Sequence, residues 1–285
     1  MLKPIQSHET KTLTSSQTTY LQVPIGGKLH SIAVRFATSA AADVTEAAIR
    51  AEISRITLKI NGVDIVNNTP AKILDLYEYL SPANVSGNTG VASMVELNVG
   101  RLLYTDPAVR DLFGIGTANV NNVQIGITAG TLSTIANAQA FTSREMKNEN
   151  LGMYMKYLEY SQSFNATGDS TVDTLPRDPD ASYLAVLVNP GASGVISHGE
   201  CRVNNNQLTD KLPASVNTLE SSNKRHTTPS GYYIYDFADG NLGTRLPMLG
   251  VNDLRFITTF STAPGAGGYS MNALTLHGLP ANLAG

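Results

Sequence analysis

The sequence predicts an all-β protein built of two tandem eight-stranded jelly rolls (a double jelly roll), with short helices in the connecting loops. Three observations support this fold class: the chain repeats itself once, its apolar residues alternate as in strands, and helical patterns are few and short. At 285 residues the chain is long enough for two domains with separate cores. We expect the first jelly roll to span residues 1–150 and the second to span residues 151–285.

The repeat consists of short segments that recur in the same order at a spacing that only shrinks. At a spacing of 152, the matching pairs are Thr18-Thr19 with Ser170-Thr171, Val23-Pro24 with Leu175-Pro176, and Ile32–Val34 with Leu184–Val186. At 143, they are Arg55–Asn61 with His198–Asn204 and Pro70 with Pro213. At 131, Val120–Ile125 matches Val251–Phe256. Each decrease falls where a loop is expected, so the second copy has shorter loops. A repeat this long indicates a duplicated domain, because solenoid repeats are about 20–50 residues long.

Most predicted strands carry apolar residues on one face only. In the run from Arg55 to Asn61, the side chains of Ile56, Leu58 and Ile60 share a face. The same alternation occurs at Val95–Val99, Val123–Thr128 and Leu274–His277, whereas Tyr183–Val188 is apolar on both faces and predicts a central strand. One-sided alternation in short strands is typical of two packed antiparallel sheets.

Helical patterns lie between the strands. Thr69 followed by Pro70 is an N-cap and first-turn pair, and apolar residues follow at helical spacing up to Leu80. Pro213, Val216 and Leu219 repeat the core positions of this helix in the second copy, which predicts that they face inward. Two further short helices are expected at Val44–Ile53 and Asp106–Phe113. About eight strands with short helices in roughly 130–150 residues favour a jelly roll over the smaller immunoglobulin-like sandwich, which has about 100 residues.

The segment between the copies has two interpretations. Asn148–Gly152 resembles a linker, and Met153–Tyr160 alternates like a strand. This strand would either pack where the two domains meet or be an ordinary edge strand.

Composition narrows the class of protein further. Charged residues make up 15% of the chain, against about 25% in a typical soluble domain. Because interface cores are depleted in charge, this indicates either a protein covered by neighbouring subunits or an uncharged secreted β-protein. No apolar stretch approaches the length of a membrane span, and the first residues lack the apolar core of a secretory signal. A net charge of −3 argues against sequence-specific nucleic-acid binding.

With these features together, the chain resembles the major capsid proteins of tailless icosahedral viruses, in particular the double jelly-roll coat proteins of membrane-containing marine bacteriophages of the corticovirus and autolykivirus types. The segments that carry the resemblance are Val23–Lys28 leading into Ile32–Arg35, Arg55–Ile60 followed by the turn Asn61-Gly62-Val63, Thr174–Arg177, and Val251–Arg255. The resemblance implies homotrimeric capsomers of pseudo-sixfold shape in a virion assembled in the host cytoplasm. It also implies strands perpendicular to the shell, an internal membrane beneath it, and penton and minor capsid or membrane proteins as partners.

No catalytic, cofactor-binding or metal-binding residues are expected. The five histidines, His8, His30, His198, His226 and His277, form no spacing typical of metal ligands. The single cysteine, Cys201, excludes intrachain disulfides, and its alignment with the core position Leu58 predicts a buried, unreactive thiol. There is no Gly-x-Ser-x-Gly nucleophile motif, and the glycine-rich segments Gly114–Gly116 and Gly265–Gly268 are expected to be turns.

Two weaker site hypotheses stay open. Asp236 and Asp239, together with Asp178 and Asp180, would suit a structural calcium ion between subunits, although aspartates in loops more often form turns. The glycosylation sequons at Asn67, Asn84 and Asn165 matter only in a secretory pathway and are expected to be chance matches in a chain rich in Asn and Thr.

The leading functional hypothesis is therefore a structural, self-assembling coat protein and not an enzyme. The main alternative is a jelly-roll carbohydrate-binding module, on a phage spike protein or a secreted enzyme. Sugar sites stack rings on exposed aromatic side chains; the chain has no tryptophan, but its 12 tyrosines keep this alternative open. No convincing pair of carboxylates suggests a glycosidase.

Overall fold

The computed structural model describes residues 5–80, 93–98, 111–224, 226–238 and 244–278. The chain divides into two compact units. Unit 1 comprises Met1–Leu80 and Asn84–Leu158, and unit 2 comprises Ser81–Ala83 and Glu159–Gly285. The boundary expected from the sequence, between residues 150 and 151, lies slightly earlier in the same connecting segment and stays a prediction.

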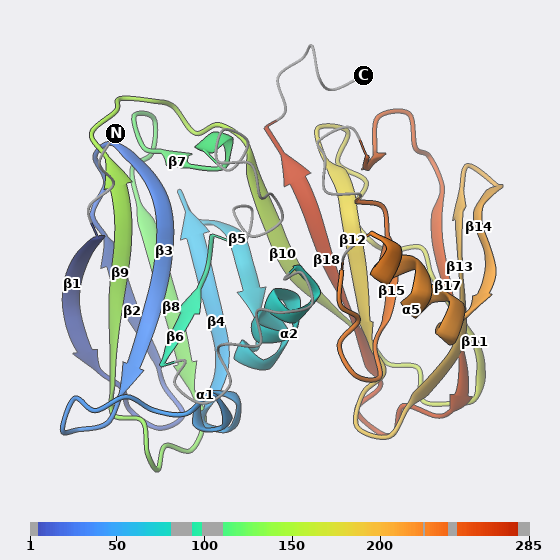
Figure 1. The fold of residues 1–285 in the computed structure, drawn as a ribbon, viewed down its shortest axis with the longest axis horizontal. Coiled ribbons are helices and arrows are strands. Elements are labelled where there is room, and N and C mark those ends of the chain that lie inside the picture. The colour runs from blue at the N-terminus through green and yellow to red at the C-terminus, as the bar shows by residue number, and fades with distance from the viewer. Residues whose placement is uncertain (1–4, 81–92, 99–110, 225, 239–243, 279–285) are drawn as a thin grey trace. The chain divides into compact units, whose positions relative to one another are not determined.

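Unit 1 contains two antiparallel sheets (Figure 1). The first has the order β1-β9-β3-β6 with β7 also beside β3; these strands are β1 Ile5–Thr12, β9 Asn137–Glu145, β3 Lys28–Ala37, β6 Met94–Glu96 and β7 Ile115–Gly116. The second has the order β2-β8-β4-β5; these are β2 Thr18–Val23, β8 Val123–Ala129, β4 Ile53–Ile60 and β5 Val63–Asn68. Strand β10, Tyr154–Gln162, begins in unit 1, where Tyr157 and Leu158 pair in parallel with Val66 and Asn67 of β5.

Unit 2 repeats this strand order. Its first sheet runs β10-β18-β12-β15 with β16 also beside β12; the strands are β18 Tyr269–His277, β12 Ser182–Asn189, β15 Tyr233–Asp236 and β16 Leu246–Pro247. Its second sheet runs β11-β17-β13-β14; the strands are β11 Gly168–Val172, β17 Leu254–Thr262, β13 Val195–Val203 and β14 Asn206–Pro213. In each unit two short strands, β6 with β7 and β15 with β16, lie beside the same long strand and together occupy one of the eight strand positions of a jelly roll. The predicted double jelly roll is therefore confirmed.

Strand register confirms most of the repeat residue by residue. Leu58 of β4 lies opposite Ile125 of β8, and Cys201 of β13 lies opposite Phe256 of β17. The structure thus preserves the predicted correspondence of Leu58 with Cys201 and of Ile125 with Phe256. Both copies also carry a bulge directly after this position, between Leu58 and Lys59 in the first copy and between Cys201 and Arg202 in the second.

Two predicted pairings are wrong by a single residue. The sequence comparison paired Pro70 with Pro213, but Pro70 begins α2, whereas Pro213 ends β14 and α5 begins at Ala214. The cause is an additional bulge in the second copy, between Gly199 and Cys201.

The other pairing concerns β2 and β11. Thr19 of β2 lies opposite Ile127, and Ser170 of β11 lies opposite Thr258. Thr258 is the counterpart of Ile127, because each lies two positions after the matched pair Ile125 and Phe256. Thr19 therefore corresponds to Ser170, whereas the sequence comparison paired Thr18 with Ser170. The extra residue lies between β11 and Leu175, where the loop is longer in the second copy.

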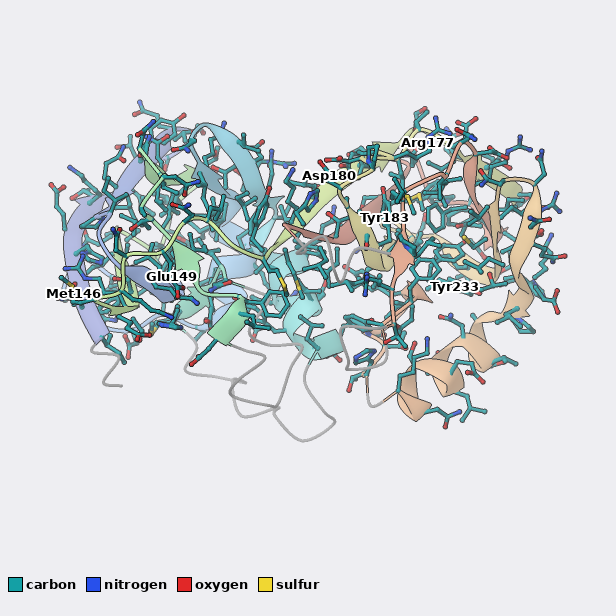
Figure 2. The ribbon with its side chains drawn as sticks, turned by 90° about the horizontal axis from the view of Figure 1, so that it is seen from above. Met146, Glu149, Arg177, Asp180, Tyr183 and Tyr233 are labelled. Carbon is teal, nitrogen blue, oxygen red and sulfur yellow. The ribbon has the colours of Figure 1, made fainter. Side chains whose placement is uncertain are left out.

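The side chains of each sheet alternate as the sequence predicts. In β4 the residues Ile56, Leu58 and Ile60 are buried, and in β17 Leu254, Phe256 and Phe260 are buried. Aromatic rings fill much of the core of unit 2: the ring centroids of Tyr235 and Phe256 lie 4.9 Å apart in an edge-on arrangement. Figure 2 shows Tyr183 and Tyr233 within unit 2, while Arg177 and Asp180 lie at its periphery. Strand Ser182–Asn189 is buried on both faces, as expected for a central strand.

Three helices lie in the described connections. Helix α1 spans Glu46–Glu52 and is capped by the Thr45 side chain; α2 spans Pro70–Leu80; and α5 spans Ala214–Asn223. Each lies where the sequence predicts a helix. The fourth expected helix, Asp106–Phe113, and the end of the expected strand at Val99 fall largely outside the described residues. Within the described part of the chain, no helix is both long and apolar enough to span a membrane.

The turns between β4 and β5 and between β13 and β14 have the same construction. Asn61 and Asn204 both adopt positive φ, at 51° and 49°, which asparagine tolerates better than most residues. The Oδ1 atom of Asn61 accepts hydrogen bonds from the two backbone N–H groups just before β8, and that of Asn204 accepts from the two just before β17. The turn predicted at Asn61-Gly62-Val63 thus makes the same hydrogen bonds in both units, and these bonds connect the strands at one end of the second sheet.

Candidate functional site

The five histidines lie apart, each with its own polar partner or strand position. His8 bonds Thr142 in unit 1, and the buried His30 lies 3.1 Å from the Glu145 carboxylate. In unit 2, His226 bonds Asp236, His277 bonds Thr275, and His198 lies on β13 opposite Thr259. Across the described residues no three His, Cys, Asp or Glu side chains gather in a way that would hold a metal ion.

The aspartates proposed as calcium ligands are engaged elsewhere. The Asp236 carboxylate accepts from His226 at 2.8 Å and from the backbone N–H of Ala238 at 3.1 Å. Asp178 accepts from the backbone N–H of Asp180 at 3.1 Å, which is a local turn and the alternative that the sequence left open. Asp239 lies outside the described residues, as does the sequon at Asn84.

Cys201 occupies the core position predicted for it. Its side chain is fully buried in unit 2, and burial raises the pKa of the thiol to about 12, with the neighbouring Glu200 charge adding to this. The thiolate is the reactive form of cysteine. A buried thiol with a raised pKa is therefore a structural side chain and not a nucleophile.

We expect Cys201 to resist alkylation in the folded protein. At pH 8 a thiol of pKa about 12 is ionised about a thousandfold less than one at the reference value of 9.0, and burial slows access further. Iodoacetamide labelling followed by mass measurement should show little adduct on the native chain and complete reaction in guanidinium chloride. Rapid labelling of the folded protein would mean that β13 has the opposite register, since a slip of one residue exchanges the two faces.

Two hollows occur on unit 2, one on each side of α5. The larger, about 360 Å³, is formed by residues 194–196, by Ala214, Ser215 and Thr218 of α5, and by residues 228–232. The smaller, about 210 Å³, lies between α5, β14 and β15. The described residues that line the larger hollow are all uncharged. In the smaller hollow the Asp236 carboxylate bonds His226, and the Lys224 ammonium donates to the Asp236 carbonyl.

The aromatic residue in the larger hollow, Tyr232, is buried, and Tyr20 on β2 is the only tyrosine with an exposed side chain in the described part of the chain. Among the residues that the structure describes, no exposed aromatic ring therefore lies beside either hollow as a platform for a sugar.

The most distinctive surface of unit 2 is an exposed apolar one on β14 and α5. Leu208 on β14 and Val216 and Leu219 on α5 are exposed, and we call these three residues with the outer edge of β14 the β14–α5 surface. The residues that α5 buries are instead polar, Asn217 and Ser221. Asn217 bonds both the N–H and the C=O of Ile234 in β15, so hydrogen bonds hold α5 to the sheet while Val216 and Leu219 are exposed. Sequence periodicity had suggested the opposite orientation, with Val216 and Leu219 inward.

Comparison with known proteins agrees with this architecture. The sequence matches the family model of the viral coat protein P2 N-terminal domain over residues 4–144 and that of the viral coat protein P2 C-terminal domain over residues 154–270. A search of curated protein sequences finds no match.

Solved structures of viral capsid proteins have the same fold. The major capsid protein P2 from Bacteriophage PM2 is 13% identical with a TM-score of 0.81, and the match covers 99% of each chain. A chain from the atomic structure of Sulfolobus Turreted Icosahedral Virus is 14% identical with a TM-score of 0.68, covering 100% of this chain and 95% of that one. A chain of the PBCV-1 virus capsid is 11% identical with a TM-score of 0.55, covering 97% and 94%. At such low identity these likenesses show the shared fold.

Proposed function

Because the chain belongs to the viral coat protein P2 family, and is thus a structural major capsid protein and not an enzyme, we propose that it works as a homotrimer. Three chains, each with two jelly rolls at residues 1–150 and 151–285, form a capsomer of pseudo-hexameric shape. These capsomers build an icosahedral shell. The matched family ranges, 4–144 and 154–270, support this division because they lie on either side of residue 150.

The observation that carries the proposal is the identical strand order of the two units combined with their different surfaces. Two similar units per chain give six similar units in a trimer, which is the basis of the pseudo-sixfold shape. A contact between the first unit of one chain and the second unit of the next is heterologous, and three such contacts close into a ring. Each copy then has to complement the other and not itself, which explains why their exposed side chains differ.

The low charge of the chain supports the same conclusion. Only 15% of its residues are charged, and permanent subunit interfaces commonly bury about 2,000 Å² or more while disfavouring unpaired ions. Neighbouring capsomers, penton and minor capsid or membrane proteins, and an internal membrane are the partners that we propose for the shell. Assembly would take place in the host cytoplasm, in a tailless bacteriophage.

Analytical ultracentrifugation tests the trimer directly. We expect a species of about 90 kDa, three times the 30.3 kDa chain, that persists on dilution to nanomolar concentration. A protein that stays monomeric at high concentration and binds glycans on an array would contradict the proposal and favour a carbohydrate-binding module instead.

A further inference from the structure

We propose that the first strand of one copy, β1, pairs in parallel with the outer edge of β14 of a second copy. This inference rests on the proposed trimer and adds the segments that form its contact. The β14–α5 surface is then the binding site for the β1 edge of the neighbouring chain.

The chain already contains one example of this pairing. In unit 1, the outer edge of β5 is covered by the start of β10, through parallel pairing of Tyr157 with Val66 and of Leu158 with Asn67. The Tyr157 hydroxyl donates to the carbonyl of Lys72 in α2 at 3.1 Å, and the Asn68 amide donates to the Tyr157 carbonyl at 3.1 Å. Tyr157 is fully buried as a result. One strand thus covers both the β5 edge and the first turn of α2.

The counterpart of the β5 edge in unit 2 is bare. Strand β14 corresponds to β5, and within the described residues β13 is its sole neighbour in the sheet. By the same spacing that relates Leu58 to Cys201, Leu208 corresponds to Ile65, since the next residues, Val66 and Thr209, pair with Leu58 and Cys201. Leu208 is 49% exposed, whereas Ile65 is 4% exposed, and Leu219 on α5 is 59% exposed. The same apolar strand position is therefore covered in unit 1 and open in unit 2. Helix α1, which packs on α2 in unit 1, has no counterpart in the described part of unit 2.

The counterpart of the covering strand is bare as well. Strand β1 is the first strand of unit 1, as β10 is of unit 2. It lies at the end of its sheet, and in the described part of the chain β9 is its one neighbouring strand. Ile5 on β1 is 77% exposed. An open edge exposes unpaired N–H and C=O groups, which another strand can bind. The two open edges, β14 and β1, are thus the counterparts of β5 and β10, which pair with each other within one chain. The partner that this implies is a second copy of the chain.

The repeat also predicts the register of this pairing. The spacing that relates Thr19 of β2 to Ser170 of β11 also relates Ser7 to Leu158. The spacing of β4 and β13 likewise relates Asn67 to Asp210. Because Leu158 pairs with Asn67, Ser7 of one copy should lie opposite Asp210 of the next. Each chain offers one β1 and one β14, so the contact is heterologous and closes after three copies in the proposed trimer.

Disulfide cross-linking tests this register. In the variant Ser7→Cys/Asp210→Cys both substituted side chains are exposed, and adjacent strands place paired Cα atoms within the range of about 4.4–6.8 Å that a disulfide spans. Oxidation of the trimer with copper–phenanthroline should yield a covalent trimer on a non-reducing gel, with residues 7 and 210 linked by mass spectrometry. The matched control is Ser7→Cys/Thr171→Cys, whose second cysteine lies on β11 at the opposite edge of the same sheet. It should link at least tenfold less.

A second pair of variants keeps the test independent of cross-linking. Leu208→Lys/Leu219→Lys should weaken trimerisation at least 100-fold without a change in thermal unfolding of the monomer, whereas Tyr20→Lys on β2, equally exposed, should leave it unchanged. If the reduced cysteine variant is a trimer by ultracentrifugation but residues 7 and 210 do not link, the strand pairing is wrong and the trimer stands. If Leu208→Lys/Leu219→Lys trimerises like the wild type, the pairing is again overturned. If the unsubstituted chain is monomeric, the proposed function itself fails.

Discussion

Replacement of Glu52 by glutamine is expected to destabilise unit 1 by about 3 kcal/mol. The Glu52 carboxylate at the end of α1 is 6% exposed. It accepts hydrogen bonds from the backbone N–H groups of Ser133, Thr134 and Ile135 and from the Ser133 hydroxyl, at 2.7–3.0 Å. Hydrogen bonds to a charged group contribute about 1.5–3 kcal/mol each. A glutamine amide keeps one acceptor oxygen but places an NH2 donor where the other oxygen stood, so the N–H groups bonded to that oxygen lose their acceptor.

The same carboxylate makes the stability of unit 1 depend on pH. The hydrogen bonds from the loop at residues 133–135 outweigh the opposing effect of burial and lower the pKa of Glu52 from 4.5 to about 2. The unfolded chain takes up a proton near pH 4.5, while the folded protein keeps the carboxylate ionised to about pH 2. The contribution of Glu52 is therefore complete above about pH 4.5 and is lost as the pH falls from there toward 2.

Denaturant unfolding of wild type and Glu52→Gln at pH 7 and pH 3 measures both effects. The difference in free energy of unfolding between the two proteins should shrink at pH 3. Glu46→Gln is the control, since Glu46 forms a partly exposed ion pair with Arg50 on the same helix and such pairs contribute about 0–1 kcal/mol. Equal effects of the two substitutions would show that the loop does not depend on the Glu52 carboxylate.

Replacement of Gly199 by isoleucine is expected to cost unit 2 about 3 kcal/mol or more. In the first copy the corresponding position is the buried residue Ile56. A Cβ at Gly199 would clash with the ring of Tyr233, which is itself buried and donates its hydroxyl to the Gly199 carbonyl. Overpacking a filled core commonly costs about 1–3 kcal/mol, and here the ring has little room to move.

The duplicated chain supplies its own rescue experiment. Val34 pairs with Val95 in the first copy and Val186 pairs with Tyr235 in the second, so the counterpart of Tyr233 is Ser93. The variant Gly199→Ile/Tyr233→Ser therefore copies the first unit's combination of residues into the second. It should recover at least half of the stability lost in Gly199→Ile, as measured by thermal unfolding.

The control for this experiment is Gly267→Ile, because a Cβ at Gly267 meets nothing within 4 Å. It should leave the unfolding temperature close to that of the wild type. A double variant less stable than Gly199→Ile alone would show that the two positions do not compensate one another.

The amino-acid sequence by itself determined the duplication, the fold class and most of the strand faces. Local periodicity decides which side chains of a strand share a face, so Leu58 and Cys201 could be assigned to the core from the pattern alone. Turn and cap chemistry is equally local, and Thr69, Pro70 and Asn61 mark the ends of elements where the structure has them. Single-residue spacing was less certain, because a one-residue insertion beside β11 changes nothing in its local pattern.

The tertiary structure decided which groups meet across long stretches of chain. Glu52 and Ser133 lie far apart in sequence, and only the pairing of β4 with β8 brings α1 to the loop that the carboxylate binds. Likewise, the ring of Tyr233 fills the space beside Gly199 from the other sheet, and no pattern along one strand can reveal this. Periodicity also placed Val216 and Leu219 inward, because it records that a helix has an apolar face but not which face the fold covers. Unit 1 covers that face with α1 and β10, and unit 2 leaves it exposed.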